Sequence, residues 1–223
     1  MKQPTVPDVL KEIQAITGFL VREGVADDQN SPVARKSRTG EISIEFAGML
    51  PVAQSLKSMP YVELYQMHND ARSYNLKMLD GGLVQILYRF QNKSLTGSIL
   101  SYLPSPELGE YQNDPELYDE DVMFAEVIER QVVAVPVRFD FDNRAEVVCD
   151  VNHPASHLTL GQYKNCRIAA GAPVTPGVFV EFILRSFYNT ASRKLSEQLP
   201  VASHRFAGSI LPKEGKLIHI AVP

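Results

Sequence analysis

The chain has 223 residues, of which 44% are hydrophobic, and it contains ten Phe and nine Tyr. This composition excludes a disordered chain and supplies a core for one folded domain, which we expect to span residues 1–223. The formal net charge of −4 excludes a protein that is basic over its whole surface. No apolar stretch approaches the roughly 18 residues that cross a bilayer, and the start Met1-Lys2-Gln3-Pro4 lacks the apolar region of a secretory signal. We therefore expect a cytoplasmic protein with no membrane partner.

Charge is distributed unevenly along the chain. Residues 153–223 contain eight Lys and Arg against three acidic residues, a net charge of +5, which leaves −9 on residues 1–152. This asymmetry suggests that one face meets an anion. The alternative interpretation is an uneven surface with no partner.

The two cysteines, Cys149 and Cys166, do not form a CxxC pair, so no zinc or redox spacing is present. In a cytoplasmic protein, two reduced and packed thiols are favoured over a disulfide.

The first quarter of the chain predicts a helix over Asp8–Arg22, where apolar residues recur at helical spacing. Residues Asp27–Gly40 have no apolar period and predict an exposed, mobile loop. Glu41–Phe46 alternates polar and apolar residues and predicts a short strand. A helical region over Val52–Met67, interrupted near Pro60, is expected next.

A β-meander is predicted from the centre of the sequence. Tyr74–Leu79 and Leu83–Phe90 flank the pair Gly81-Gly82, and paired glycines supply the positive φ angles that a hairpin turn requires. Leu95–Tyr102 would add a third strand.

The second half continues with an acidic helix over Asp114–Glu129 and a second hairpin made of Val137–Asp142 and Ala145–Val151, both of which alternate. Thr175 and Pro176 suit the N-cap and first position of a long helix that would end at Arg193 and Lys194. Leu217–Val222 predicts a last strand. These elements define the fold class as α+β, an antiparallel sheet built from hairpins with helices packed on it.

The segment Asp150–Ile168 carries the chemistry-bearing side chains. It gathers two histidines four residues apart, a hydroxyl and two cations; its candidate site residues are His153, His157, Thr159, Tyr163, Lys164 and Arg167. Histidine exchanges a proton near neutral pH, and Lys or Arg can stabilise charge on a phosphoryl oxygen. If the segment is a strand, Thr159 shares a face with His157. The combination suits cleavage of a phosphodiester without a metal or other cofactor.

Each of these residues also has a structural interpretation. His153 precedes Pro154 and can end a turn, and His157 can be a buried histidine with its hydrogen bonds satisfied. Tyr163 can serve packing. Lys164 and Arg167 can be surface charges.

Metal binding is a separate alternative. His153 and His157 have i, i+4 spacing, but Pro154 argues against one continuous helix that presents both. Carboxylates from Asp140, Asp142 or Asp150 could complete such a site. The strand Arg138–Asp142 places Asp140 and Asp142 on one face, where acidic residues are also common because the face is solvated.

Five ordered motifs resemble an uncharacterised bacterial family, domain of unknown function 2290. The motifs are YNLKMLDGGLVQILYRF (74–90), LPSPEL (103–108), VRFDFD (137–142), HPASHLTLGQYKNCRI (153–168) and TPGVFVEFILRSFY (175–188). The resemblance covers Pro60–Tyr188 and implies a bacterial antiviral defence setting.

Two further resemblances concern the histidine segment. An Arg/Asp strand joined to an HPxxHxH stretch is similar to a family of ribonuclease-like toxins of toxin–antitoxin systems; here Thr159 replaces the last histidine. His157-Leu158-Thr159-Leu160 fits the H-x-T-x motif of two-histidine phosphoesterases, whose second copy would be His219–Val222, with Ala221 in place of the hydroxyl residue.

These observations lead to two functional hypotheses. The first is a nucleic-acid-directed toxin or defence effector, a metal-independent ribonuclease in which His157 is the general base or acid and His153 its partner. Lys164 and Arg167 would stabilise the transition state, and Arg138 with Asp140 would orient them. The second is a non-catalytic subunit of a phage-defence or toxin–antitoxin complex that binds nucleic acid or a protein partner, with the acidic region Glu107–Glu129 docking a basic partner.

Overall fold

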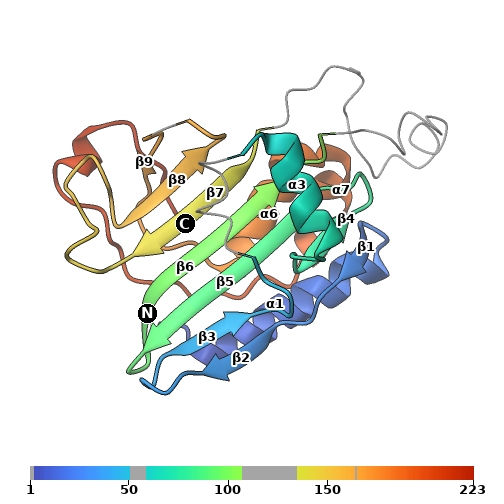
Figure 1. Cartoon of the computed structure of the whole chain (residues 1–223), viewed down its shortest axis with the longest axis horizontal. Coiled ribbons are helices and arrows are strands. Elements are labelled where there is room, and N and C mark those ends of the chain that lie inside the picture. Colours follow the sequence, from blue (N-terminus) through green and yellow to red (C-terminus); the bar gives the residue numbers. More distant parts are fainter. Residues whose placement is uncertain (1–2, 51–58, 107–134, 164) are drawn as a thin grey trace.

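The computed structural model describes residues 3–50, 59–106, 135–163 and 165–223, whose strands form one nine-stranded sheet (Figure 1). The strands are β1 (Ala26–Gln29), β2 (Val33–Lys36), β3 (Ile42–Glu45), β4 (Leu76–Met78), β5 (Leu83–Gln91), β6 (Ser94–Leu103), β7 (Val137–Asp142), β8 (Ser156–Leu160) and β9 (Ile168–Ala169). Their order is β1-β4-β5-β6-β7-β8-β9. In addition, β3 pairs with β5, and β2 pairs with β3. All of these pairs are antiparallel.

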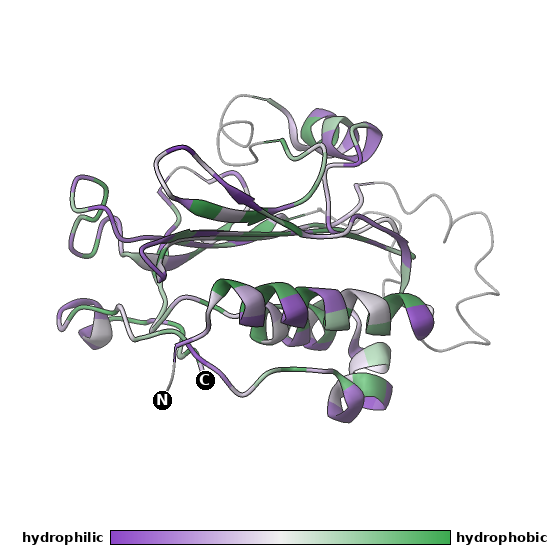
Figure 2. Ribbon diagram, turned by 90° about the horizontal axis from the view of Figure 1, so that it is seen from below, coloured by the Kyte–Doolittle hydropathy of each residue, from purple (hydrophilic) through white to green (hydrophobic). Residues whose placement is uncertain are grey.

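The helices lie on both faces of the sheet. They are α1 (Val6–Arg22), α3 (Tyr61–Asp70), α6 (Pro176–Phe187) and α7 (Asn189–Leu195), with short 3₁₀ turns η1 (Ser196–Gln198) and η2 (Glu214–Lys216). Figure 2 shows α1 and α6 on one face and α3 on the other. The predicted α+β class, an antiparallel sheet with helices packed on it, is therefore confirmed.

The main core lies between the sheet and the pair α1 and α6. Ile86, Leu100, Phe139 and Leu158 stand opposite one another on β5 to β8, and all four are buried. Side chains on directly opposed residues share a face of the sheet, so they form one apolar row. Phe139 meets Phe179 of α6 edge-on, with ring centroids 6.2 Å apart.

The opposite face carries polar rows. Gln85, Ser101, Arg138 and Thr159 are successive cross-strand partners on β5, β6, β7 and β8. Two residues along β7, Asp140 pairs with His157. The period of two along a strand thus places Arg138, Asp140, His157 and Thr159 together on the face that does not pack against α6.

Several predicted elements are confirmed. The helix predicted over Asp8–Arg22 is α1, at whose start the Asp8 carboxylate accepts hydrogen bonds from the Thr5 N–H at 2.9 Å and the Thr5 hydroxyl at 2.6 Å. The meander is β4, β5 and β6, and its first turn uses Gly81 at φ +88°. Gly82 packs so closely that a Cβ there would lie 2.6 Å from the Tyr188 hydroxyl.

Other predictions are wrong. The loop expected over Asp27–Gly40 contains β1 and β2, although β2 is exposed throughout as expected. Ala145–Val151 is not a strand, because both edges of β7 are already paired, with β6 and with β8. The expected last strand is reduced to one bridge between Ala170 and Ile220. The long helix is two helices, α6 and α7, which meet at Tyr188.

Two predicted helical regions concern residues that the structure describes only in part or not at all. Of Val52–Met67, the described portion contains α3, which begins at Tyr61 after Pro60. The acidic helix over Asp114–Glu129 lies outside the described residues.

Candidate functional site

Three charged or titratable side chains form a buried network on β7 and β8. The Arg138 Nε atom donates to Asp140 Oδ2 at 2.7 Å, and the side chains of both residues are nearly buried, at 12% and 14% exposure. His157 Nε2 lies 3.5 Å from the same Asp140 oxygen, and only 3% of the His157 side chain is exposed. On its other side His157 Nδ1 lies 2.8 Å from the carbonyl oxygen of Pro154. His157 is therefore held at both ring nitrogens.

The neighbours of Asp140 favour the charged form of its carboxylate. Burial raises the pKa of Asp140, but the hydrogen bond from His157 and the positive charge of Arg138 outweigh burial, so the pKa of Asp140 is lowered from its ordinary value. A carbonyl oxygen can only accept a hydrogen bond, so His157 Nδ1 carries a proton. The Nε2 edge of the ring faces Asp140, so the carboxylate lies between the Arg138 guanidinium and the His157 imidazole.

His153 lies beside this network with one ring nitrogen occupied. Its Nδ1 donates to the carbonyl oxygen of Val147 at 2.7 Å, and its ring centroid is 5.1 Å from that of His157. Burial lowers the pKa of His153, and the charge of Arg167 lowers it further; the Val147 hydrogen bond opposes these effects without cancelling them. His153 is therefore neutral at pH 7, with the lone pair on Nε2.

A pocket of about 410 Å³ opens at His153 and is lined by Val151, Asn152, His153, Asn165 and Arg167. Its lining combines a guanidinium and two amides, which can donate to the oxygens of an anion, with a neutral imidazole whose free Nε2 can accept a proton or a hydrogen bond. His157 does not line this pocket. The structure thus separates the two histidines, one facing the pocket and one buried behind it.

Two residues of the pocket have a left-handed backbone, Val151 at φ +65° and Asn165 at φ +65°. Asn tolerates this conformation, whereas a β-branched residue such as Val is strained in it.

Replacing Val151 by glycine is expected to raise the free energy of unfolding by about 1 kcal/mol, because glycine adopts positive φ without steric cost. Urea denaturation measures the change. Asn152→Gly is the matched control; since Asn152 has no positive φ, this change should only increase the entropy of the unfolded chain and lower stability. A loss of stability in Val151→Gly equal to that of the control would contradict the strain at Val151.

The other predicted site residues are placed as follows. Thr159 is on the same face as His157, as predicted, but stands opposite Arg138, and its buried hydroxyl has no hydrogen-bond partner within the described part of the chain. Tyr163 is 75% exposed, so the packing interpretation is wrong. Lys164 lies outside the described residues.

Both cysteines are free thiols, Cys149 exposed and Cys166 partly buried, so neither is packed in the core.

For the metal alternative, the described residues contain no group of three or more His, Cys, Asp or Glu side chains that could hold a metal ion. Asp142 instead pairs with Arg144 at 2.5 Å, and Asp150 pairs with Lys213 at 2.7 Å. Two of the three carboxylates that could have joined the histidines are thus directed to surface cations, and the third, Asp140, pairs with Arg138.

Sequence reasoning did not assign a role to Val151, Asn152 or Asn165. The one available signal was Asn165, since Asn is enriched among residues with positive φ outside glycine. Val151 gave no such signal, because its backbone conformation is set by the bridge between Cys149 and His153 that closes the turn around it.

The fold and the site define an α+β protein with an antiparallel sheet, in which the connections from β7 to β8 and from β8 to β9 form a pocket lined by a histidine and an arginine. The model of a protein family described as an uncharacterized conserved protein, DUF2290, matches residues 25–222 of the chain. The chain therefore belongs to the DUF2290 family. No curated protein and no solved structure shows a significant match to it. None of the helices in the described ranges has the length and apolar composition that a membrane crossing requires.

Proposed function

We propose that this protein is a nucleic-acid-directed effector that binds an RNA phosphodiester at His153 and Arg167 and cleaves it without a metal ion. One observation carries the proposal: His153 is held by its Nδ1–H on the Val147 carbonyl and is kept neutral beside Arg167 in an open pocket. A neutral imidazole with one nitrogen anchored and the other accessible is the arrangement of a general base.

In the proposed reaction, His153 Nε2 takes the proton of a ribose 2′-hydroxyl. The 2′-oxygen attacks phosphorus, the bond from phosphorus to the 5′-oxygen breaks, and the 5′-oxygen takes a proton from water. The products are a 2′,3′-cyclic phosphate and a 5′-hydroxyl. Arg167 would stabilise the negative charge that builds on the phosphoryl oxygens. In this scheme the general base is His153, and His157 is a positioning residue that supports the His153 ring from behind.

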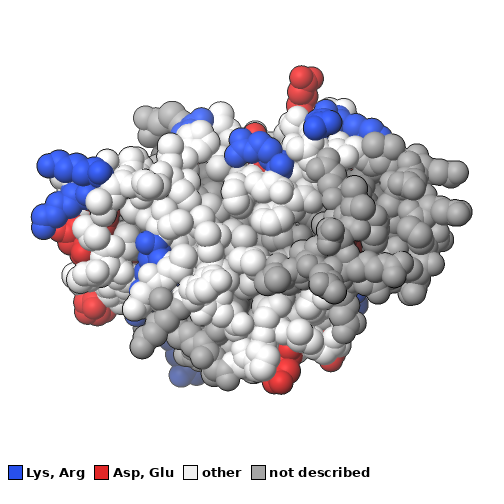
Figure 3. Space-filling model, turned by 90° about the horizontal axis from the view of Figure 1, so that it is seen from above, with Lys and Arg blue, Asp and Glu red and all other residues white. Residues whose placement is uncertain are grey.

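The charge distribution supports a local contact with phosphate rather than a long nucleic-acid track. On the face shown in Figure 3, Lys and Arg form separate clusters and no continuous band over the described residues. Arg167 supplies the phosphate contact among the described residues, and the predicted role of Lys164, which lies outside them, stays a prediction. The defence setting is implied by the resemblance of the five motifs to DUF2290, and the toxin role by the resemblance of the HPASHLT segment. A cytoplasmic location would bring the site to its RNA.

The test is cleavage and binding of a short single-stranded RNA by purified protein, with His153→Ala and Arg167→Ala compared with the wild type. Loss of the base is expected to lower the cleavage rate by roughly 100-fold or more. Arg167→Ala should weaken RNA binding and reduce its salt dependence by about one phosphate contact. Arg38→Ala is the control, since Arg38 is an exposed arginine in the turn before β3.

The pH profile gives a second readout. A base must be unprotonated, so the cleavage rate should fall with decreasing pH through the lowered pKa of His153, below the ordinary value of 6.5. Equal cleavage by the wild type and His153→Ala would remove His153 from the reaction.

The second candidate function is non-catalytic binding of RNA or of a protein partner within a defence or toxin–antitoxin complex. The burial of His157, at 3% exposure, favours it, because one of the two imidazoles cannot reach a substrate. In that case the wild type would bind RNA with the same dependence on Arg167 and leave the RNA intact. The acidic region Glu107–Glu129, outside the described residues, would serve a basic protein partner, whose capture by the wild type alone would support this alternative.

A further inference from the structure

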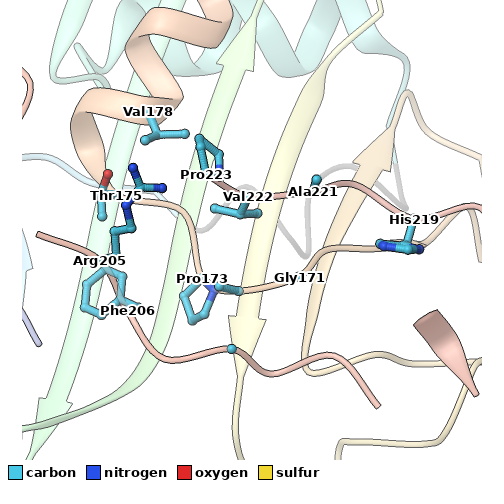
Figure 4. A pocket seen from close by; sticks show the side chains of 12 residues that line it. Gly171, Pro173, Thr175, Val178, Arg205, Phe206, His219, Ala221, Val222 and Pro223 are labelled. Atoms are coloured by element: carbon cyan, nitrogen blue, oxygen red, sulfur yellow. The ribbon is translucent and has the colours of Figure 1, made fainter. Parts of the chain in front are cut away.

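A second pocket lies at the N-terminal end of α6, on the opposite face of the sheet from the Arg138–Asp140–His157 network. It has a volume of about 270 Å³ and its lining includes Thr175, Val178, Arg205 and Phe206. Figure 4 shows the Thr175 hydroxyl and the Arg205 guanidinium turned toward the same part of the pocket. Neither residue contributes to the pocket at His153.

The Thr175 hydroxyl is the first sign that this pocket is built for a ligand. Thr175 is only 3% exposed, and its Oγ1 atom has no hydrogen-bond partner among the residues that the structure describes. Although Thr175 is the N-cap of α6, its side chain makes no capping hydrogen bond. A buried polar group without a partner is costly, and a ligand atom in the pocket would satisfy it.

Arg205 is the second sign, because its neighbours on both sides are anchored. His204 Nε2 lies 2.9 Å from the buried carboxylate of Glu12. Phe206 is buried, and its ring centroid is 5.8 Å from that of Tyr88. The backbone at Arg205 is thereby fixed, and its side chain forms no hydrogen bond or ion pair within the described ranges.

The electrostatics of the pocket favour binding of an anion. The start of a helix carries a partial positive charge, Arg205 adds a full one, and the Thr175 hydroxyl can donate. Apart from His219, the rest of the lining is apolar or glycine and includes Pro173, Val178, Phe206 and Val222. The volume is just below the usual range for ligand pockets, so the occupant must be small.

We propose that this pocket binds a small organic anion, with a carboxylate or phosphate head on Arg205 and Thr175 and a compact apolar body against Phe206 and Val178. The site is independent of the proposed RNA site, because the two pockets share no residue.

The experiment is isothermal titration calorimetry of the full chain with benzoate, phenyl phosphate and inorganic phosphate, and with benzyl alcohol as the uncharged comparison. Benzoate or phenyl phosphate should bind, and benzyl alcohol should not. Stronger binding of phenyl phosphate than of benzoate would assign a phosphate head, and the reverse a carboxylate. Inorganic phosphate, which lacks the apolar body, should bind more weakly than phenyl phosphate.

Two variants test the residues. Arg205→Gln should raise the dissociation constant by about tenfold or more, as expected for loss of a charged hydrogen bond. Thr175→Val keeps the shape of the side chain and removes the hydroxyl, so it should weaken anion binding severalfold without lowering the melting temperature of the ligand-free protein. Arg193→Gln, at an exposed arginine of α7, should bind as the wild type does.

Absence of binding by both organic anions at millimolar concentration would overturn the proposal, as would equal affinities in the wild type, Arg205→Gln and Thr175→Val. A fall in the melting temperature of ligand-free Thr175→Val would show that the hydroxyl serves the helix start instead of a ligand. Retention of anion binding by His153→Ala and Arg167→Ala is also expected, and its loss would place the anion in the other pocket.

Discussion

Asp140→Ala is expected to lower the free energy of unfolding by about 3–5 kcal/mol, because it leaves the nearly buried Arg138 guanidinium without its counterion and His157 Nε2 without its acceptor. Arg138 is 12% exposed and His157 3% exposed, and both are directed to Asp140 Oδ2. Urea denaturation followed by circular dichroism measures the change.

Asp142→Ala is the matched control for this prediction. Asp142 lies two residues further along β7 and also pairs with an arginine, but the partner Arg144 is 56% exposed. Exposed ion pairs contribute about 0–1 kcal/mol, so the control should cost far less. An equal loss of free energy of unfolding in the two variants would show that the buried network stabilises the protein no more than an exposed ion pair does.

The same network has a defined dependence on pH. The pKa of Asp140 is lowered in the folded protein from its ordinary value of 3.8, so the unfolded chain binds the proton more readily. The stabilisation is therefore fully present above about pH 4 and is lost as the pH falls through the lowered pKa of the folded state. Asp140→Asn should remove this part of the acid sensitivity. An unchanged difference in stability between wild type and Asp140→Asn from pH 6 to pH 2 would contradict the assignment.

The network was partly predictable from sequence, because a strand has a period of two. Alternation in VRFDFD and in the SHLTL segment places Arg138 and Asp140 on one face of β7, and His157 and Thr159 on one face of β8. The register that sets Asp140 opposite His157 depends on contacts between distant segments. The sequence therefore predicts the members of the network but not that they contact one another, and it predicts His157 as the general base or acid although the structure buries it.

Strand pairing was the least predictable feature of the fold. Ala145–Val151 alternates as well as β8 does, yet β8 pairs with β7. Conversely, β1 and β2 consist of the polar segments ADDQ and VARK. Edge strands are stabilised by backbone hydrogen bonds more than by burial, so their sequences need no apolar period.

Glu12 is a buried acidic residue whose need for partners is visible in the sequence. Glu12 lies within the apolar stripe of α1, beside Val9, Ile13 and Ile16, and all four residues are buried. An acidic residue on the buried face of a helix requires partners. Those partners come from beyond residue 170, so the sequence indicates that Glu12 requires hydrogen-bond partners but not which residues supply them.

Glu12→Ala is expected to be the second strongly destabilising change, with a loss of about 3 kcal/mol or more. The Glu12 carboxylate accepts hydrogen bonds from the backbone N–H of Gly177 at 3.2 Å and of Ala202 at 3.0 Å, and His204 Nε2 lies 2.9 Å away. One carboxylate thus joins α1 to the start of α6 and to the segment after η1. Glu23→Ala, which removes an acid paired with the exposed Arg22 at the end of the same helix, is the control and should cost much less.

Glu12→Gln separates the two functions of this side chain. The amide oxygen can still accept from the N–H groups of Gly177 and Ala202, so most of the stability should be kept, whereas the charge that faces His204 is lost. Because His204 and Phe206 fix the backbone of Arg205, loosening His204 should also weaken benzoate or phenyl phosphate binding at the α6 pocket. Hydrogen exchange at Gly177 and Ala202 reports on the first effect and calorimetry on the second. Full stability in Glu12→Ala, with slow exchange at both amides, would show that Glu12 does not hold these segments together.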